Sequence, residues 1–283
     1  MARGMSLHIG LNRVDPNHYQ DADGQPWDGA LNACEFDAHD MEAIAKKKGF
    51  ATRRKLLTAD ATADAVRQGI LDAARRLAAG DLFLVTYSGH GGQVPDTNHD
   101  ETVLPSGQKD RMDETWALYD RELIDDELYV LWAKFKAGVR ISVLSDSCHS
   151  GSVVRALPPT LMGLPPGARL RRMPVKVAES TFRAHRKLYT DLQKANPTAE
   201  RSIVKAGVIL ISGCQDNQFS LDGDRNGLFT ETMKKVWRSG KFTGTYRAFR
   251  DRIVSLMPET QTPNYFVVGK PNHTFEAQTP FSI

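Results

Sequence analysis

The sequence predicts an α/β fold built on an open, mostly parallel sheet with helices on both faces. Three short runs are apolar along nearly their whole length: Asp81–Tyr87, Val139–Leu144 and Gly207–Ile211. Strands of this kind are buried on both sides, which is typical of parallel sheets covered by helices. Segments with helical spacing alternate with these runs along the chain, and this alternation favours the α/β class.

The other elements follow from the spacing of apolar residues. Ser6–Asn12 predicts a first strand. Ala30–Gly49 and Thr62–Gly80 carry apolar residues at helical spacing, and each ends at a glycine, a frequent helix terminator. The same pattern predicts helices over Asp125–Ala137, Gly227–Arg238 and Thr245–Leu256. Tyr265–Val268 predicts a last strand.

Length and composition exclude several classes of protein. The chain has 283 residues, of which 41% are apolar and 25% charged, and this composition excludes disordered, collagen-like and coiled-coil chains. No window approaches the roughly 18 apolar residues of a membrane span. The apolar run Leu7–Leu11 is too short for the core of a signal peptide. We therefore expect a cytoplasmic protein without a membrane partner, and the formal charge of +3 selects no partner by itself.

The cysteines point to a reducing compartment. Cys34, Cys148 and Cys214 are far apart, odd in number and never in a Cys-x-x-Cys pair. This arrangement argues against a disulfide framework or a zinc site and favours reduced thiols.

A basic stretch interrupts the alternation of strands and helices over residues 156–206. Between Arg155 and Lys205 there are eleven Lys and Arg against three Asp and Glu, and the stretch opens with two Pro-Pro pairs. A connection of this length indicates a functional loop. The other interpretation is a surface excursion with a short helix near Thr181–Gln193. Only Phe182 and Tyr189 interleave the basic residues, so we expect no nucleic-acid partner.

Polar residues of unusual type follow two of the apolar strands. The first strand end reads Tyr-Ser-Gly-His-Gly-Gly over residues 87–92, and the second reads Ser-Asp-Ser-Cys-His-Ser-Gly over residues 145–151. Ligands collect beyond the carboxyl ends of parallel strands, so His90 and Cys148 can face one crevice. A thiol becomes a good nucleophile when a base helps to form its thiolate. The amides of Gly91 and Cys148 could then donate to an oxyanion.

Five segments in this order resemble the metacaspases, the caspase-like cysteine peptidases of bacteria, plants, fungi and protists. They are Leu31–Ala38, Ser88–Gly91, Asp146–Gly151, Ser212–Gln218 and Gly227–Thr230. The resemblance implies a caspase-like sheet of about six strands in a single domain over residues 1–283. It further implies a large-subunit-like part (1–155), a linker (156–206) and a small-subunit-like part (207–283).

The resemblance also implies the activity. It implies a dyad of Cys148 and His90, and cleavage of polypeptides after Arg or Lys. The positions that match the family's specificity pocket carry the expected residue types: Cys34, Asp37, Ser88 and Asp146. Two carboxylates that converge on one pocket would pair with a guanidinium or ammonium group and repel an acidic side chain. The simpler interpretation of Asp37 is a helix N-terminal residue. Because metacaspases are mostly monomeric, we expect a monomer.

An acidic segment is a candidate calcium site. Many metacaspases bind Ca²⁺ there, and the matching positions are Asp113, Asp125 and Asp126. Ca²⁺ takes six to eight oxygen ligands, which acidic pairs supply. The loop between the pairs is short, and Arg155 stands where some calcium-binding members carry Asp, so the site should be weakened. The alternative is a solvated acidic face.

A second acidic motif, Asp222–Gly227, resembles half of an EF-hand loop. Its twelfth position is Met233 rather than Glu, so we interpret the motif as a turn. No organic cofactor is implied.

An enzyme that selects Arg or Lys could cut its own basic stretch. The candidate positions for self-cleavage are Arg169, Arg171, Arg172 and Lys176, which lie in a Pro-flanked stretch that we expect to be exposed.

Two other functions compete with a peptidase. A cysteine phosphatase carries Cys-x5-Arg, whereas six residues separate Cys148 from Arg155 here, and Ser147 replaces the usual His. The second alternative is an inactive caspase-like scaffold that binds partners. Because both dyad residues are present, the sequence favours a cysteine endopeptidase that works through a thioester.

Overall fold

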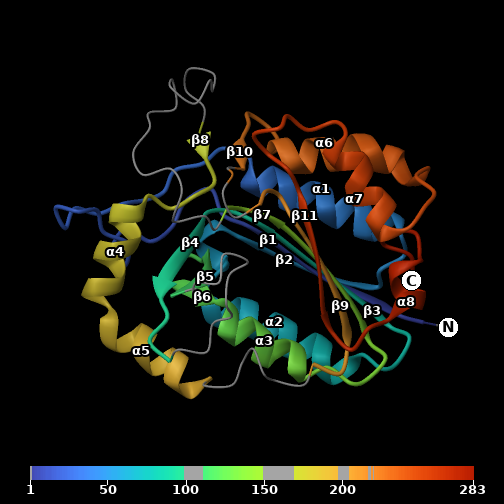
Figure 1. Ribbon diagram of the computed structural model, residues 1–283, viewed down its shortest axis with the longest axis horizontal. Helices are drawn as coiled ribbons and strands as arrows, with labels where there is room; N and C mark the ends of the chain where they lie inside the picture. Colours follow the sequence, from blue (N-terminus) through green and yellow to red (C-terminus); the bar gives the residue numbers. More distant parts are fainter. Residues whose placement is uncertain (1, 99–110, 149–168, 197–203, 216–217, 219) are drawn as a thin grey trace.

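The fold is an α/β sandwich around a six-stranded sheet, as predicted (Figure 1). The computed structural model describes residues 2–98, 111–148, 169–196, 204–215, 218 and 220–283. The strand order is β11-β9-β7-β3-β1-β2, and every neighbouring pair is parallel except the antiparallel β11 and β9. The sheet strands are β1 (Gly4–Gly10), β2 (Thr52–Leu57), β3 (Leu82–Ser88), β7 (Arg140–Asp146), β9 (Gly207–Ser212) and β11 (Asn264–Gly269).

Helices cover both faces of this sheet. One face packs against α2 (Ala63–Arg76) and α3 (Asp125–Ala133). The other packs against α1 (Cys34–Lys47), α6 (Leu228–Trp237) and α7 (Tyr246–Val254). Two separate apolar cores result, one on each side of the central strands β3 and β7, whose fourteen residues are all buried.

Smaller elements surround the carboxyl end of the sheet. A three-stranded antiparallel sheet and a two-stranded ribbon lie there, together with a pair of short helices at the left of Figure 1. They comprise β4 (Gly91–Pro95), β5 (Met112–Ala117), β6 (Glu122–Ile124), β8 (Arg169–Leu170), β10 (Leu221–Asp222), α4 (Val175–Ala184) and α5 (Arg186–Ala195). The short helix α8 (His273–Glu276) and two 3₁₀ turns, Thr58–Asp60 and Arg238–Gly240, complete the described elements.

The main departures from the predicted elements are local. The single helix expected near Thr181–Gln193 is two helices, α4 and α5, because the chain leaves helical geometry at His185. Strand β2 was not predicted, because it is an edge strand whose sequence Thr-Arg-Arg-Lys-Leu-Leu lacks a continuous apolar run. Helix α3 ends at Ala133, four residues before the predicted end.

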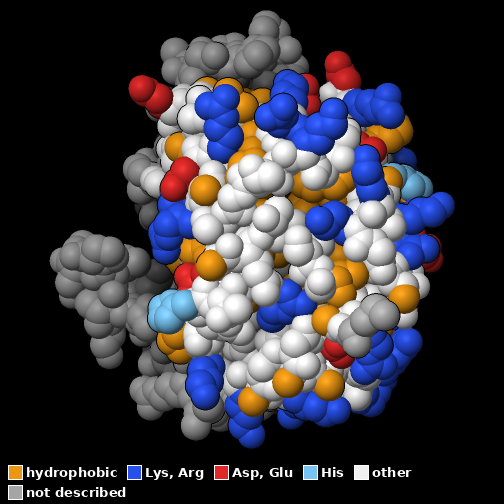
Figure 2. Space-filling model, turned by 90° about the vertical axis from the view of Figure 1, so that its right-hand side faces the viewer, with side chains coloured by type: hydrophobic (Ala, Val, Ile, Leu, Met, Phe, Trp, Pro, Cys, Tyr) orange, Lys and Arg blue, Asp and Glu red, His pale blue; other side chains and the backbone are white. Residues whose placement is uncertain are grey.

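Basic side chains lie on a face away from the carboxyl end of the sheet. Figure 2 shows that Lys and Arg are spread over the side that faces right in Figure 1, with few Asp and Glu among them. Several carboxylates, by contrast, are buried in the interior, among them Asp37 and Asp146. Among the described residues, no helix is both long and apolar enough to cross a membrane.

Candidate active site

The predicted crevice forms at the carboxyl ends of the central strands. Strand β3 ends at Ser88 and leads to His90, whereas β7 ends at Asp146 and leads to Cys148. The register pairs Ser88 with Asp146, so the two strand ends lie side by side. All four residues are buried.

Arg171, from the basic stretch, occupies the pocket predicted for a basic side chain. Its guanidinium is fully buried. Nη2 lies 2.7 Å from Oδ2 of Asp37, and Nη1 lies 2.8 Å from Oδ2 of Asp146. Nη1 also donates to Oγ of Ser88 at 2.7 Å. Three of the four predicted pocket residues therefore contact one arginine.

A third carboxylate completes this pocket. It belongs to Asp222, a residue of the motif that was predicted to be a turn. Oδ1 of Asp222 accepts from Nη2 and Nε of Arg171 at 3.0 and 3.3 Å. Asp222 is held in place by the backbone amides of Asn32 and Ala33. Each of the three guanidinium nitrogens, Nε, Nη1 and Nη2, therefore donates to at least one acceptor. The surrounding carboxylates raise the pKa of Arg171 despite its burial, so the side chain is charged.

The two predicted carboxylates are fixed by polar neighbours. Asp37 accepts from Asn226 Nδ2 at 2.8 Å and from Ser88 Oγ at 2.7 Å. Asp146 accepts from Thr230 Oγ1 at 2.7 Å. The pKa of Asp37 is raised to about 6, mainly by burial and also by the nearby Asp146, against the lowering effect of Arg171.

The remaining pocket residue, Cys34, also lies close to Arg171. Its pKa is raised mainly by burial, and the positive charge of Arg171 acts in the opposite direction. Cys34 begins helix α1, and its amide donates to Asn12 Oδ1.

The glycine at the start of α6 makes room for the guanidinium. A Cβ atom built on Gly227 would lie 2.4 Å from Cζ of Arg171 and 2.6 Å from Oδ2 of Asp146. Any side chain at this position would fill the space that the arginine occupies. The pocket therefore requires glycine at position 227 as well as the carboxylates that line it.

The backbone of Arg171 meets the two amides that were predicted to bind an oxyanion. The Arg171 carbonyl oxygen accepts from the amides of Gly91 and Cys148, each at 3.1 Å. On either side of this carbonyl, the Arg171 amide donates to Ser220 O, and the Met173 amide donates to Gly91 O. Residues 169–173, which we call the Arg171 segment, therefore lie extended between β4 and β10.

His90 is oriented by a backbone carbonyl that the sequence did not indicate. Its Nε2 lies 2.9 Å from the carbonyl oxygen of Gly29. Because a carbonyl only accepts, Nε2 carries the proton and Nδ1 carries the lone pair. Nδ1 is buried and has no hydrogen-bond partner in the described part of the chain.

The pKa of His90 keeps its ring neutral near pH 7. Burial lowers this pKa to about 4, whereas the carbonyl of Gly29 and the backbone of Arg172 raise it. A neutral ring can take up a proton at Nδ1.

Cys148 does not contact His90 through a described hydrogen bond. Its sulfur lies 2.6 Å from Sγ of Cys214 and accepts the amide of Ser220. Burial and the Cys214 thiol raise the pKa of Cys148 well above its usual value. In this arrangement Cys148 is a protonated thiol.

The four predicted self-cleavage positions differ in their surroundings. Arg169 and Lys176 are exposed, Arg172 is half-buried and Arg171 alone of the four is fully buried. The expected exposure is therefore wrong for Arg171, which is buried because its guanidinium pairs with the pocket carboxylates, whereas Arg169 and Lys176 lie at the surface.

The three predicted calcium ligands have different surroundings in the described part of the chain. Asp113 accepts from Gln193 at 2.6 Å, and Asp126 accepts from Asn98 at 3.1 Å. Asp125 instead lines a cavity beside β7 and β9. Within the described ranges, no three His, Cys, Asp or Glu side chains lie close enough together to hold a metal ion. Arg155 lies outside the described residues, so its predicted effect is not represented here.

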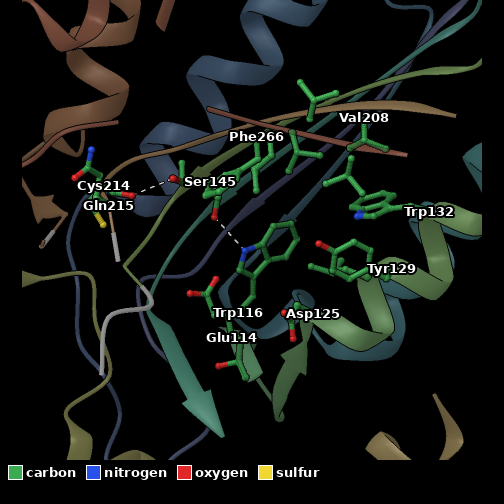
Figure 3. A pocket seen from close by; sticks show the side chains of 17 residues that line it. Glu114, Trp116, Asp125, Tyr129, Trp132, Ser145, Val208, Cys214, Gln215 and Phe266 are labelled. Carbon is green, nitrogen blue, oxygen red and sulfur yellow. Dashed lines mark hydrogen bonds between the residues drawn. The ribbon is translucent and has the colours of Figure 1, made fainter. Parts of the chain in front are cut away.

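A cavity of about 330 Å³ adjoins the site on the α3 side of the sheet. Figure 3 shows Cys214 and Gln215 at one end, Trp132 and Val208 at the other, and the indole of Trp116 between them. Trp116 donates to Ser145 at the end of β7, 3.0 Å away.

Comparisons with known proteins match most of the chain to one family. A family model described as caspase domain matches residues 14–275. Metacaspase-1 of Kluyveromyces lactis is 29% identical over 237 residues, which cover 72% of this chain and 53% of that protein. Metacaspase-1 of Schizosaccharomyces pombe is 29% identical over 244 residues, which cover 74% of this chain and 55% of that protein. The chain thus spans little more than half the length of these relatives.

Solved structures give the same fold. The crystal structure of protein GSU0716 from Geobacter sulfurreducens is 50% identical, with a TM-score of 0.84 over 99% of this chain and 98% of that one. Caspase-1 from Spodoptera frugiperda is 11% identical, with a TM-score of 0.50 over 95% and 86% of the two chains. At that identity, the caspase comparison supports the fold alone.

Proposed function

Because the chain belongs to the family of caspase-domain peptidases, we propose that it is a cysteine endopeptidase that cleaves polypeptides after arginine or lysine. One observation carries the proposal. The Arg171 carbonyl accepts from the amides of Gly91 and Cys148 while its guanidinium pairs with Asp37 and Asp146. A substrate residue on the acyl side of a scissile bond needs both of these contacts.

The proposed mechanism begins with the nucleophile. The thiol of Cys148 gives its proton to Nδ1 of His90, and the sulfur attacks the carbonyl carbon of the basic residue. Gly91 and Cys148 amides stabilise the charge that develops on the carbonyl oxygen, a contribution of about 3–4 kcal/mol per donor in a serine protease. For this step the sulfur must turn from Cys214 toward the carbonyl. The Gly29 carbonyl keeps the lone pair of His90 directed at the reacting groups.

The second half of the reaction uses the same groups. His90 donates its proton from Nδ1 to the leaving amine, and a thioester remains on Cys148. Water then attacks the thioester with His90 as general base, and the acid product leaves. The protein's own side chains supply every proton transfer in this scheme, and no step involves a metal ion.

The specificity follows from charge and shape. A basic side chain enters a buried site lined by Asp37, Asp146 and Asp222, whereas an acidic one would face three like charges. Peptide partners with basic residues are therefore the expected substrates. Calcium activation stays a prediction.

Self-processing is part of the proposal. The Arg171 segment occupies the site in the manner of a substrate, so the peptide bond between Arg171 and Arg172 is the one that the nucleophile would attack. Until that bond is cut or the segment leaves, a second polypeptide cannot enter the same pocket. The chain would then be made as a self-blocked precursor.

Fluorogenic peptides that end in Arg, Lys or Asp test the peptidase activity. We expect hydrolysis after Arg and Lys but not after Asp, and none by the Cys148→Ala variant. Each reaction is run with Ca²⁺ and with a chelator, which tests the calcium prediction separately. Cleavage only after Asp would contradict the pocket assignment, and equal cleavage by Cys148→Ala would contradict the nucleophile.

A further inference from the structure

The proposed nucleophile has a second thiol against its sulfur. Sγ of Cys148 lies 2.6 Å from Sγ of Cys214, and both cysteines are free thiols. They come from the ends of neighbouring parallel strands, since Ser145 of β7 pairs with Ser212 of β9. We propose that Cys148 and Cys214 form a reversible disulfide when a peroxide reaches the pair, and that this modification switches off the peptidase.

The backbone holds the two thiols together without help from the substrate pocket. The Gly213 amide donates to Ser145 O at 2.7 Å, which joins the two strand ends just before the cysteines. Gln261 donates to Gly213 O, and Ser212 Oγ donates to Cys214 O, each at 3.0 Å. Both sulfurs therefore lie on anchored backbone, so a bond between them requires only side-chain rotation.

Cys214 gives a small oxidant a route to the pair. Cys214 lines the cavity in Figure 3, whereas Cys148 does not and is fully buried beneath the Arg171 segment. The cavity holds about 330 Å³, far more than a peroxide molecule needs. The oxidant can thus reach Cys214 while the substrate pocket is occupied.

The chemistry balances with one equivalent of hydrogen peroxide. The Cys214 sulfur attacks the peroxide, an S–O bond forms as the O–O bond breaks, and one water leaves. The Cys148 sulfur then attacks the sulfenic acid, an S–S bond forms as the S–O bond breaks, and the departing hydroxide takes the Cys148 proton as a second water. Two thiols are oxidised and one peroxide is reduced to two waters.

The third cysteine is a natural control. Cys34 is also fully buried and lies beside Arg171, but within the described residues no second sulfur contacts it. Burial alone therefore does not distinguish Cys34 from Cys148. The two cysteines differ because a second thiol contacts the sulfur of Cys148.

The test is peroxide treatment of the full chain, followed by peptide mapping under non-reducing conditions. We expect a linked peptide pair that contains Cys148 and Cys214, with one of the three thiols left free. The mapping does not depend on activity, so it decides the disulfide even if the proposed function, on which the switch rests, fails. Finding both cysteines unlinked, or Cys34 linked to either, would overturn the proposal.

Activity measurements with variants then test the switch. Peroxide should inactivate wild type, and dithiothreitol should restore its activity. Cys214→Ser should form no linked peptide, and its inactivation should persist after dithiothreitol, because Cys148 then oxidises beyond the sulfenic acid. Equal recovery of Cys214→Ser and wild type would show that Cys214 does not protect Cys148, and would overturn the switch.

Discussion

Nη1 of Arg171 lies 2.8 Å from Oδ2 of Asp146, two residues before the proposed nucleophile. The pair joins the basic stretch to the end of the central strand β7. A buried ion pair is weak evidence of stabilisation, since desolvation offsets much of the attraction. The position of the Arg171–Asp146 pair is more informative, because the pair aligns the Arg171 carbonyl with the amides of Gly91 and Cys148.

Replacing Arg171 should open the site to other polypeptides. In Arg171→Gln, an external peptide no longer competes with an internal arginine, so we expect its apparent KM to fall about tenfold with little change in kcat. Steady-state kinetics with an Arg peptide measure this. Arg169→Gln is the matched control, because Arg169 is exposed and its side chain donates to Ala30 and Asn32 rather than to the pocket carboxylates. A similar fall in KM for both variants would contradict a specific block by Arg171.

Arginine should be preferred to lysine. Nε and Nη2 of Arg171 donate to Asp222, but lysine carries a methylene in place of Nε and cannot reproduce both contacts. Hydrogen bonds to charged groups contribute about 1.5–3 kcal/mol each, so we expect kcat/KM to favour an Arg peptide by roughly ten- to a hundredfold.

The Asp222→Asn variant should narrow that preference, and its kinetics on Arg and Lys peptides provide the check. Asp40→Asn is a useful comparison, because Asp40 lies near the pocket but binds Lys234 and Asn226 rather than Arg171. An unchanged Arg-to-Lys ratio in Asp222→Asn would argue against this role for Asp222.

Activity toward Arg peptides should fall as the pH drops through about 6. The pKa of Asp37 is raised to about 6, chiefly by burial, so Asp37 loses its charge below this pH and no longer pairs with the guanidinium. A second decrease should follow near pH 4, where His90 becomes protonated and can no longer accept a proton.

The Asp37→Asn variant separates the two decreases. It should be less active than wild type at pH 8 and should lack the step near pH 6 while keeping the one near pH 4. Profiles of kcat/KM against pH measure both. If Asp37→Asn shows both decreases in kcat/KM, the decrease near pH 6 belongs to another group.

The sequence was most informative where side chains follow buried strands. Strands β3 and β7 are apolar on both faces, so their polar ends stand out, and the structure brings Ser88, Asp146, Gly91 and Cys148 around one arginine. Basic residues in the stretch 156–206 suggested self-recognition, but four positions were equivalent in sequence. Burial and the ion pairs with the pocket carboxylates distinguish Arg171 from Arg169 and Lys176.

Contacts between distant segments were not predictable from local pattern. Gly29 orients His90 through its backbone carbonyl. Its positive φ of 56° favours glycine, but no local pattern connects this glycine with a histidine 61 residues later. Asp222 reads locally as a turn, and its role depends on Arg171, 51 residues earlier. Cys214 was recognised in a family segment, but its contact with Cys148 depends on the pairing of β7 with β9.

The central claim is that Arg171 lies in the site as a substrate does. Intact-mass analysis of the purified chain during incubation tests it most directly, with Cys148→Ala as the control. We predict two fragments, 1–171 and 172–283, that accumulate in wild type and are absent in Cys148→Ala. A first cut after Arg169, Arg172 or Lys176, or the same cut at an equal rate in Cys148→Ala, would contradict the account.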